Sequence, residues 1–435
     1  MLKNTILTFF QQTAGILVGL VTSIFIARLL GPDGQGQLAL LILLPMMLYS
    51  FLNMGISPST IYFLGRKETD RNTILKTNFY STILLSLIAL LAGFIVITLF
   101  HDKFFDGVPE KLLLLILPVA IPIFFNQNFR VFFQGIENFR SYNLTVLFEK
   151  ISYLLLLVIA LYFLKFQLMG AMASFIFTQL ILLLLIVLLL SNDGFSLRKG
   201  AFSSDYLKGS LVYGIKSYLS NILAFLNYRI DILLISYFLE TIEVGLYFLA
   251  VSIAEKLWVG SNSISAVLFA RLSNMSSDKD KTHLTAMVSR HIFNLSCIGA
   301  LITGLLSFWF IPLIFGNSFE GSIAPFLYLL PGIAFGAVSK IISNDFSGKG
   351  KPEINTYVAV FLLTENIILN IILIPKLGLV GAALATSITY STNAIVKIII
   401  FAKINKVRVS NCLFLRGSDL VLYKTLLFKL LNKGF

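Results

Sequence analysis

Apolar runs of about 20 residues recur twelve times along this 435-residue chain, and they constrain its fold more than any other feature. A helix of that length crosses the roughly 30 Å hydrocarbon core of a bilayer. The runs are continuous and rich in leucine, which excludes the period-two alternation of membrane β-strands. We therefore predict an all-α polytopic membrane protein with transmembrane helices at residues 5–27, 37–57, 78–100, 111–129, 144–164, 168–190, 211–239, 244–270, 291–315, 322–345, 356–375 and 378–401.

Composition supports this class. Hydrophobic residues make up 57% of the chain and charged residues 13%, which is too little polar surface for a soluble globule. The net charge of +13 is better explained by membrane orientation than by nucleic-acid binding, so no nucleic-acid partner is expected. Two cysteines, Cys297 and Cys412, provide neither a disulfide framework nor metal-ligand spacing, and we expect no metal and no cofactor. Residues 1–30 are interpreted as an uncleaved first membrane helix.

Basic residues indicate the orientation. Most of the 34 Lys and Arg residues fall at the N-terminus, in the tail and in the connections that follow the even-numbered helices. The positive-inside rule then places both termini in the cytoplasm. The outward connections are all short, which argues against an enzyme that acts on an external polymer.

The chain resembles itself at two nearly equal offsets. Residues 26–40 align with 235–249 at an offset of 209, which places Gly36 on Gly245, and residues 164–178 align with 375–389 at an offset of 211. The repeat unit is six helices, an even number, so both copies enter the membrane from the same side. We predict two parallel six-helix bundles, at 1–200 and 201–402, with a substrate site between them and a tail at 403–435.

Two further segments have simpler interpretations. In the stretch A-R-L-L-G-P-D-G-Q-G, Gly31 and Pro32 end the first helix, and Gly34 and Gly36 allow close packing. The tail alternates Leu and Tyr with Lys, as in a short basic amphipathic helix on the inner leaflet, with Leu420, Tyr423, Leu427, Leu430 and Leu431 set against Lys424, Lys429 and Lys433.

Charged residues inside the apolar runs are the candidate functional residues, because a charge at membrane depth is costly unless it has a partner or faces a watery cavity. The first half of the chain is expected to hold almost none. The second half holds Lys216, Arg229, Asp231, Glu255, Lys256, Lys340, Glu365 and Lys397.

Each of these charges has a structural alternative. Lys216 and Asp231 lie toward opposite ends of their helix and could be satisfied by neighbouring helices or headgroups. Glu255 could pair with a cation or line a cavity as a protonatable group, and Glu365 lies midway along its helix. Lys340 and Lys397 are interpreted as residues of the inner edge.

Cations outnumber anions in this set, which favours an anionic substrate such as a pyrophosphate or an acidic sugar over a cationic drug. We predict that Lys216, Arg229 and Lys256 attract the substrate, and that Glu255, Glu365 and Asp231 handle a coupling ion.

Five motifs in register resemble the polysaccharide transporter family, the Wzx-type O-antigen or capsule repeat-unit flippases. They are ARLLGPDGQG at 27–36, FFQGIENFRSYN at 132–143, YRIDILLISYFLETIEVGLYFLA at 228–250, SGKGKPEINTY at 347–357 and IPKLGLVGAALATSITY at 374–390.

The resemblance implies the fold of the multidrug/oligosaccharidyl-lipid/polysaccharide exporter superfamily, which is MATE-like. It also implies translocation of undecaprenyl-pyrophosphate-linked oligosaccharide across a bacterial inner membrane by alternating access, with ion antiport and with a polysaccharide polymerase and a chain-length regulator as partners. Arg28 matches the family's first-helix motif and joins the expected substrate site, and Arg229 and Asp231 match its R-x-D pattern. The alternatives are a multidrug cation antiporter of the same fold and, less favoured, a membrane polysaccharide polymerase.

Overall fold

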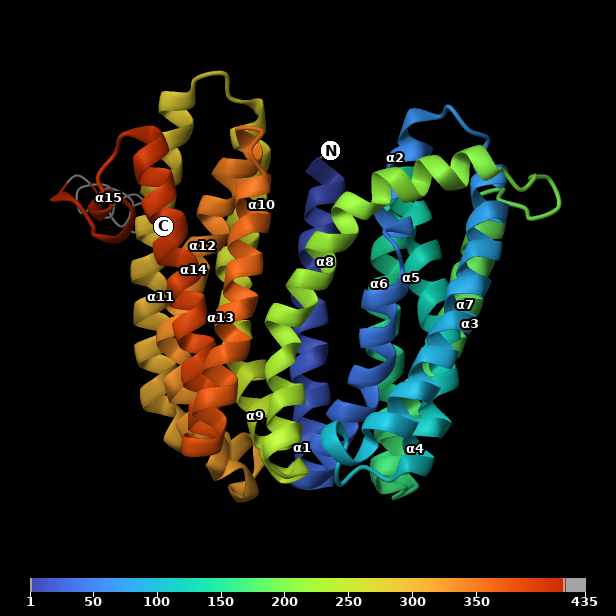
Figure 1. Ribbon diagram of the computed structural model, residues 1–435, viewed down its shortest axis with the longest axis horizontal. Coiled ribbons are helices and arrows are strands. Elements are labelled where there is room, and N and C mark those ends of the chain that lie inside the picture. The colour runs from blue at the N-terminus through green and yellow to red at the C-terminus, as the bar shows by residue number, and fades with distance from the viewer. Residues whose placement is uncertain (1, 418, 420–435) are drawn as a thin grey trace, which may run out of the picture. The chain divides into compact units, whose positions relative to one another are not determined.

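The computed structural model describes residues 2–417 and 419, which contain helices and no β-strand (Figure 1). The expected basic amphipathic helix of the tail falls on residues outside this range. The chain divides into two compact units, one of residues 1–249 with 310–322 and one of residues 250–309 with 323–435. The predicted repeat bundles at 1–200 and 201–402 remain a prediction.

The first unit contains eight α-helices, the start of a ninth, the end of an eleventh and three short helices of other types. The α-helices are α1 (Leu2–Leu52), α2 (Ile56–Arg66), α3 (Arg71–Phe104), α4 (Glu110–Ile116), α5 (Ala120–Gly135), α6 (Phe139–Val158), α7 (Gln167–Asn192) and α8 (Ser204–Phe238). The short helices are η1 (Leu117–Val119), η2 (Ile159–Phe163) and η3 (Asn317–Ser322).

Helix α9 (Thr241–Lys256) passes from the first unit into the second. The second unit then contains α10 (Trp258–Asn274), most of α11 (Asp278–Phe315), α12 (Ile323–Gly348), α13 (Glu353–Leu377), α14 (Leu379–Asn405) and α15 (Ser410–Leu413).

Ten helical segments among the described residues are long and apolar enough to cross a membrane. One of them, α1, contains two predicted spans that meet at Gly31, where the backbone leaves the helical conformation (φ 68°) before Pro32 restarts it. The predicted span 244–270 is instead two helices, α9 and α10, each shorter than a membrane crossing requires. With α1 counted as two spans and α9 with α10 as one, the segments correspond to the twelve predicted.

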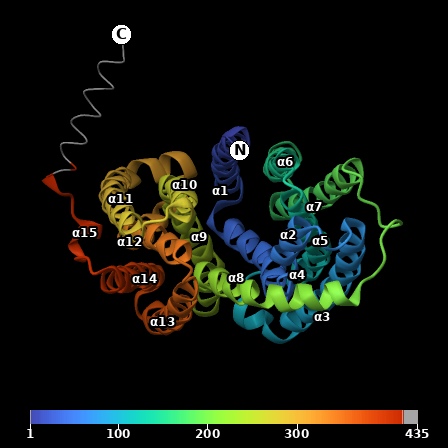
Figure 2. The same ribbon diagram turned by 90° about the horizontal axis from the view of Figure 1, so that it is seen from above.

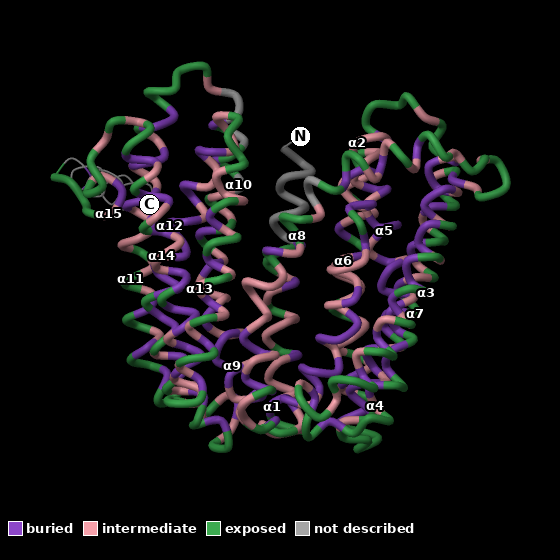
Figure 3. Tube along the Cα trace, in the orientation of Figure 1, coloured by how far each residue is buried: buried purple, intermediate pink, exposed green. Residues whose placement is uncertain are grey.

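Exposed apolar side chains mark the surfaces that lipid would cover. Figure 3 shows exposed residues along the outward faces of α3, α7 and α11. They include Leu91, Leu184 and Leu301, each at least 60% exposed. Because a soluble monomer rarely exposes so much contiguous apolar surface, this distribution fits a protein embedded in a bilayer.

The core of the first unit is aromatic. Phe129 and Phe132 of α5 stack with ring centroids 5.6 Å apart, and both pack in one buried cluster with Leu182 of α7 and Tyr206 of α8. The first part of α8 lies across the ends of α2 and α3 (Figures 1 and 2). Tyr206 donates a hydrogen bond to Asn78 at 3.1 Å, which ties this part of α8 to α3.

Two glycines let α1 and α9 cross at backbone contact within the first unit. A Cβ on Gly36 would lie 1.9 Å from the Thr241 carbonyl oxygen, and a Cβ on Gly245 would lie 1.9 Å from the Pro32 carbonyl oxygen. Both pairs of equivalent residues, Gly36 with Gly245 and Pro32 with Thr241, are 209 positions apart in the sequence. Reciprocal contacts of this kind are the signature of a local two-fold axis, so they support the internal repeat found in the sequence.

Capping of two helix ends follows the same relation. Arg28 donates hydrogen bonds to the carbonyl oxygens of Leu313 and Ile314 at the end of α11, and Ser236 donates one of 2.7 Å to Phe104 at the end of α3. Leu313 and Phe104 are again 209 positions apart. Arg28 of α1 therefore caps α11, and Ser236 near the end of α8 caps α3.

Candidate functional site

The break between α9 and α10 positions two charged residues of the second unit, Glu255 and Lys256. Helix α9 ends at Lys256 and α10 begins at Trp258, with a turn closed by a 3.1 Å hydrogen bond from the Leu257 amide to the Ala254 carbonyl. Lys256 donates a 2.9 Å hydrogen bond to the Ser252 carbonyl. Discontinuous membrane helices typically expose backbone groups and charges at the depth where substrates bind.

Four side chains gather on α9, α10 and α12 at this break, and we call Glu255, Trp258, Asn262 and Lys340 the Trp258 cluster. The Lys340 ammonium lies 3.9 Å from the centroid of the Trp258 ring and donates to the Asn262 side-chain oxygen at 2.9 Å. Glu255 interacts with Lys340 electrostatically. The Trp258 indole is buried and donates to the Ile333 carbonyl at 2.8 Å, so it is a fixed platform for the cation.

Lys397 of α14 packs against α12 at residues close to Lys340 in sequence. It is 7% exposed, and its ammonium donates to the hydroxyls of Ser343 at 2.9 Å and Ser339 at 3.3 Å. The sequence predicts an inner-edge residue here, but the structure directs the ammonium to these two serines.

Glu365 on α13 has one carboxylate oxygen paired and one unpaired. The first accepts a 2.9 Å hydrogen bond from Thr392 of α14. The second is buried and has no hydrogen-bond partner among the described residues. A buried carboxylate oxygen without a donor is suited to hold a proton or a cation.

The first unit holds the other predicted site residues. Asp231 is buried and accepts a 2.7 Å hydrogen bond from the Tyr247 hydroxyl. Arg229 donates to the Tyr228 carbonyl at 3.2 Å, and Arg28 caps α11 as described above. Lys216 lies within α8, but its side chain is outside the part of the structure that is described. Thus Glu255 is brought to a cation, Asp231 is brought to a tyrosine, and Arg28 is directed to backbone.

The expectation that the first half holds almost no charge at membrane depth is wrong. Arg130 lies in α5, which continues to Gly135 beyond the predicted end at 129. Glu149 and Lys150 lie inside the segment 139–163, and Arg130 pairs with Glu149 at 2.5 Å. Both residues of α6 stand within the run predicted from the sequence, so the apolar pattern itself contained the signal.

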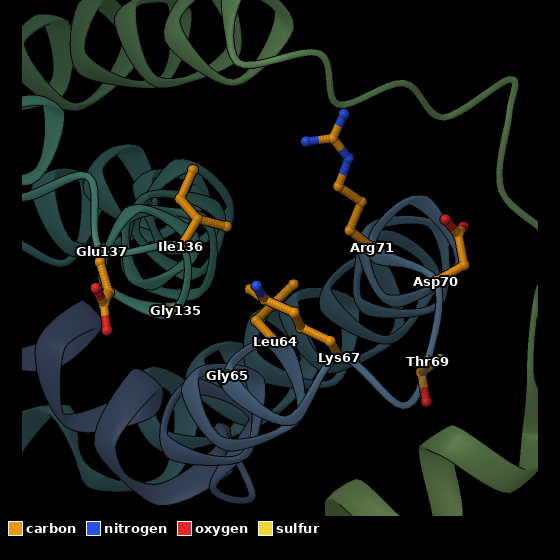
Figure 4. A pocket seen from close by; sticks show the side chains of 9 residues that line it. All are labelled: Leu64, Gly65, Lys67, Thr69, Asp70, Arg71, Gly135, Ile136 and Glu137. Carbon is orange, nitrogen blue, oxygen red and sulfur yellow. The ribbon is translucent and has the colours of Figure 1, made fainter.

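One cavity lies at the ends of α2, α3 and α5, with a volume of about 610 Å³ (Figure 4). Its lining includes Lys67 and Arg71 together with Asp70 and Glu137, so neither sign of charge is in excess. Arg71 donates to the carbonyl oxygens of Asp193 and Gly194. The cavity lies at the edge of the predicted membrane segments, and we assign it no role in the substrate path.

Comparisons with known proteins agree with this architecture. The profile of a family described as polysaccharide biosynthesis protein matches residues 1–276. A Shigella flexneri protein with the provisional name O-antigen transporter is 25% identical over 409 residues, which cover 91% of this chain and 96% of that protein. A Haloferax volcanii protein, provisionally named low-salt glycan biosynthesis flippase Agl15, is 25% identical over 47% of this chain and 44% of its own length.

Solved structures share the fold at low identity. The lipid II flippase MurJ in an inward closed conformation matches with a TM-score of 0.78 and 15% identity, over 95% of this chain and 89% of that one. A multidrug resistance MATE transporter of the MOP superfamily in an inward-facing conformation matches with a TM-score of 0.72 and 18% identity, over 92% and 95%. The all-α, MATE-like prediction is thereby confirmed.

Proposed function

The chain belongs to the polysaccharide biosynthesis protein family, and from this premise we propose that it moves undecaprenyl-pyrophosphate-linked oligosaccharide repeat units from the cytoplasmic to the outer leaflet of a bacterial inner membrane. The observation that carries the proposal is the full-length alignment with the O-antigen transporter of Shigella flexneri. The named relatives are transporters or flippases, so the prediction that this multi-pass membrane protein is not an enzyme is confirmed.

The charges at membrane depth support an anionic headgroup as the recognised part of the substrate. In a medium of low dielectric constant, a lysine ammonium attracts a diphosphate far more strongly than it does in water. Lys340 is held on the rigid indole face of Trp258, and Lys256 stands at the helix break two residues before that tryptophan. Lys216 and Arg229 remain proposed substrate-binding residues, and Arg28 is proposed to support substrate binding by fixing a helix end.

Ion coupling is proposed at the carboxylates. Glu365 has a buried oxygen without a donor, Glu255 stands near Lys340, and Asp231 has its tyrosine partner. Each could take up an ion in one conformation and release it in another, which is the requirement for antiport.

Alternating access is supported by the contact of Gly36 with Gly245. The two backbones touch there with no side chain between them, and the two glycines occupy equivalent positions in the proposed repeats. A contact of this type can separate and reform without rearranging rotamers. We propose that it closes the outer side when the inner side is open. A polysaccharide polymerase and a chain-length regulator are proposed partners.

Deletion and complementation in the native host test the function. Deletion is expected to leave lipid-linked repeat units on the cytoplasmic face and to remove surface polysaccharide, and wild-type protein should restore it. Normal surface polysaccharide after deletion, in a host without a paralogue, would contradict the proposal. Sensitivity to cationic dyes with intact glycans would indicate the multidrug alternative instead.

Substitutions of Lys340 test whether this residue takes part in the proposed transport. Lys340→Gln should reduce surface polysaccharide at equal protein level, because it removes the cation and leaves the Trp258 platform. Lys340→Arg keeps the charge over the ring and is expected to retain most of the output. Equal output from the Gln and wild-type proteins would remove Lys340 from the mechanism.

A further inference from the structure

Glu149 of α6 lies between two basic residues in the first unit. Its carboxylate accepts a 2.5 Å hydrogen bond from the Arg130 guanidinium and one of 3.1 Å from the Gln179 side chain. Asn126 in turn donates to the Gln179 side-chain oxygen at 2.8 Å, so the carboxylate is held by α5 and α7. Lys150, the next residue of α6, interacts with Glu149 electrostatically.

This group of residues carries excess positive charge and an unused donor. Arg130 is 8% exposed, and its Nε is buried without a hydrogen-bond partner among the described residues. Leaving a buried donor unpaired is costly, so an additional acceptor at this position would stabilise the protein.

Lys150, the residue after Glu149, supplies an accessible cation on α6. The lysine is exposed, and its ammonium donates a 3.2 Å hydrogen bond to the Gly15 carbonyl of α1. About 16 Å of helix separates Lys150 from the start of α6 at Phe139, further than a lysine side chain can reach to a headgroup layer. Its exposure therefore needs a polar environment at membrane depth.

We propose that Arg130 and Lys150 bind the diphosphate of the substrate, and that Glu149 is a tethered counter-anion that occupies Arg130 when no substrate is bound. This inference rests on the proposed function. It adds a residue, Glu149, whose role is to lower the affinity of the protein for the diphosphate. A diphosphate must displace the carboxylate from Arg130 and the Gly15 carbonyl from Lys150. The competition would keep binding weak enough for release at the outer leaflet, since a site that binds too tightly cannot turn over.

Equilibrium binding to the full-length protein in lipid nanodiscs tests the competition, with radiolabelled farnesyl diphosphate as the probe. Lys150→Gln should weaken binding about tenfold or more, the usual effect of losing a hydrogen bond to a charged group. Glu149→Gln should tighten binding, because the neutral amide no longer competes. Thermal melting of each variant establishes that it is folded. Glu149→Asp keeps the negative charge, so a Glu149→Asp protein with the wild-type melting temperature should bind the probe with wild-type affinity.

Gly15→Ala is the matched control for Lys150. A Cβ at position 15 would lie 2.8 Å from the Lys150 ammonium and would push that flexible end away from the carbonyl. If Lys150 acts by binding the diphosphate, Gly15→Ala should preserve or tighten binding, because the Gly15 carbonyl competes for the same ammonium. If Lys150 only pins α1 to α6, Gly15→Ala should reproduce the Lys150→Gln defect, and the proposal is overturned.

Inorganic diphosphate separates recognition of the headgroup from partition of the prenyl chain into lipid. It should displace the label from wild-type protein and do so less well from Lys150→Gln. A lack of displacement from wild-type protein, or weaker binding by a folded Glu149→Gln protein, would overturn this inference alone. A wild-type protein that binds no farnesyl diphosphate would instead count against the proposed function.

Discussion

Asp419 and Arg290 form a buried bidentate ion pair that holds the segment after α15 against α11. Two hydrogen bonds of 2.6 Å join the guanidinium to the carboxylate, and Arg290 also donates to the Asn411 carbonyl at 3.5 Å. Hydrogen bonds from Arg290 lower the pKa of Asp419 from 3.8 to about 2. The pair therefore contributes stability that is complete above about pH 4 and is lost as the pH falls toward 2.

Arg290→Gln should release this segment at neutral pH. Breaking one side of a buried ion pair costs about 3–5 kcal/mol, so amide protection of residues 411–417 should fall by more than about a hundredfold in hydrogen exchange. Arg408→Gln, at an exposed position nearby, is the control and should leave protection unchanged. Unchanged protection in Arg290→Gln would show that the buried Cys412 and its apolar neighbours hold the segment without the ion pair.

At the scale of single residues, the sequence predicted which second-half charges lie within membrane segments but not their partners. Arg28 finds carbonyl oxygens 285 and 286 positions away, and Glu365 finds Thr392 on the next helix. Such pairings depend on helix rotation and tilt, which hydropathy does not determine. Glu149 and Lys150 lie inside the predicted span 144–164 but are not among the charges expected at membrane depth.

Helices α1 and α9 cross without side chains between them, so a side chain added at the crossing should destabilise the packing of these two helices. Gly245→Ala would place its Cβ 1.9 Å from a carbonyl oxygen of α1, so the helices must separate. Overpacking of this type costs about 1–3 kcal/mol, and the melting temperature in detergent should fall. Gly299→Ala, in α11 with open space around the added methyl group, should melt at or above the wild-type temperature. Equal melting of both variants would contradict a closed contact at Gly36.

The sequence predicted where membrane helices occur better than it predicted where they are interrupted. The glycine and proline at 31 and 32 correctly marked the end of the first span. By contrast, no glycine or proline between Ala254 and Trp258 marks the break at Leu257. The charges Glu255 and Lys256 are the one available signal, since a charged pair is costly within an unbroken lipid-facing helix.

For the molecule as a whole, the internal repeat was the most productive inference. An offset found between weakly similar segments predicted that Gly36 and Gly245 occupy equivalent positions, and the structure places them in reciprocal contact. Equivalence in sequence does not say that two residues touch, because a two-fold axis can pass anywhere. Predicting that the two glycines touch would have required the packing of α1 against α9 in the first unit.

Orientation in the membrane is the last property that the chain's charges predict. Three candidate spans, at 110–135, 139–163 and 167–192, separate Asp106 from Lys199, so these two exposed residues must lie on opposite sides. In a protein with Cys297→Ala and Cys412→Ala, Asp106→Cys should react with an impermeant maleimide in intact spheroplasts. Lys199→Cys should react only after permeabilisation, because the basic connections face the cytoplasm. Labelling of both cysteines from one side would contradict the three-span count, and reversed labelling would contradict the orientation, and with it the proposed outward direction of transport.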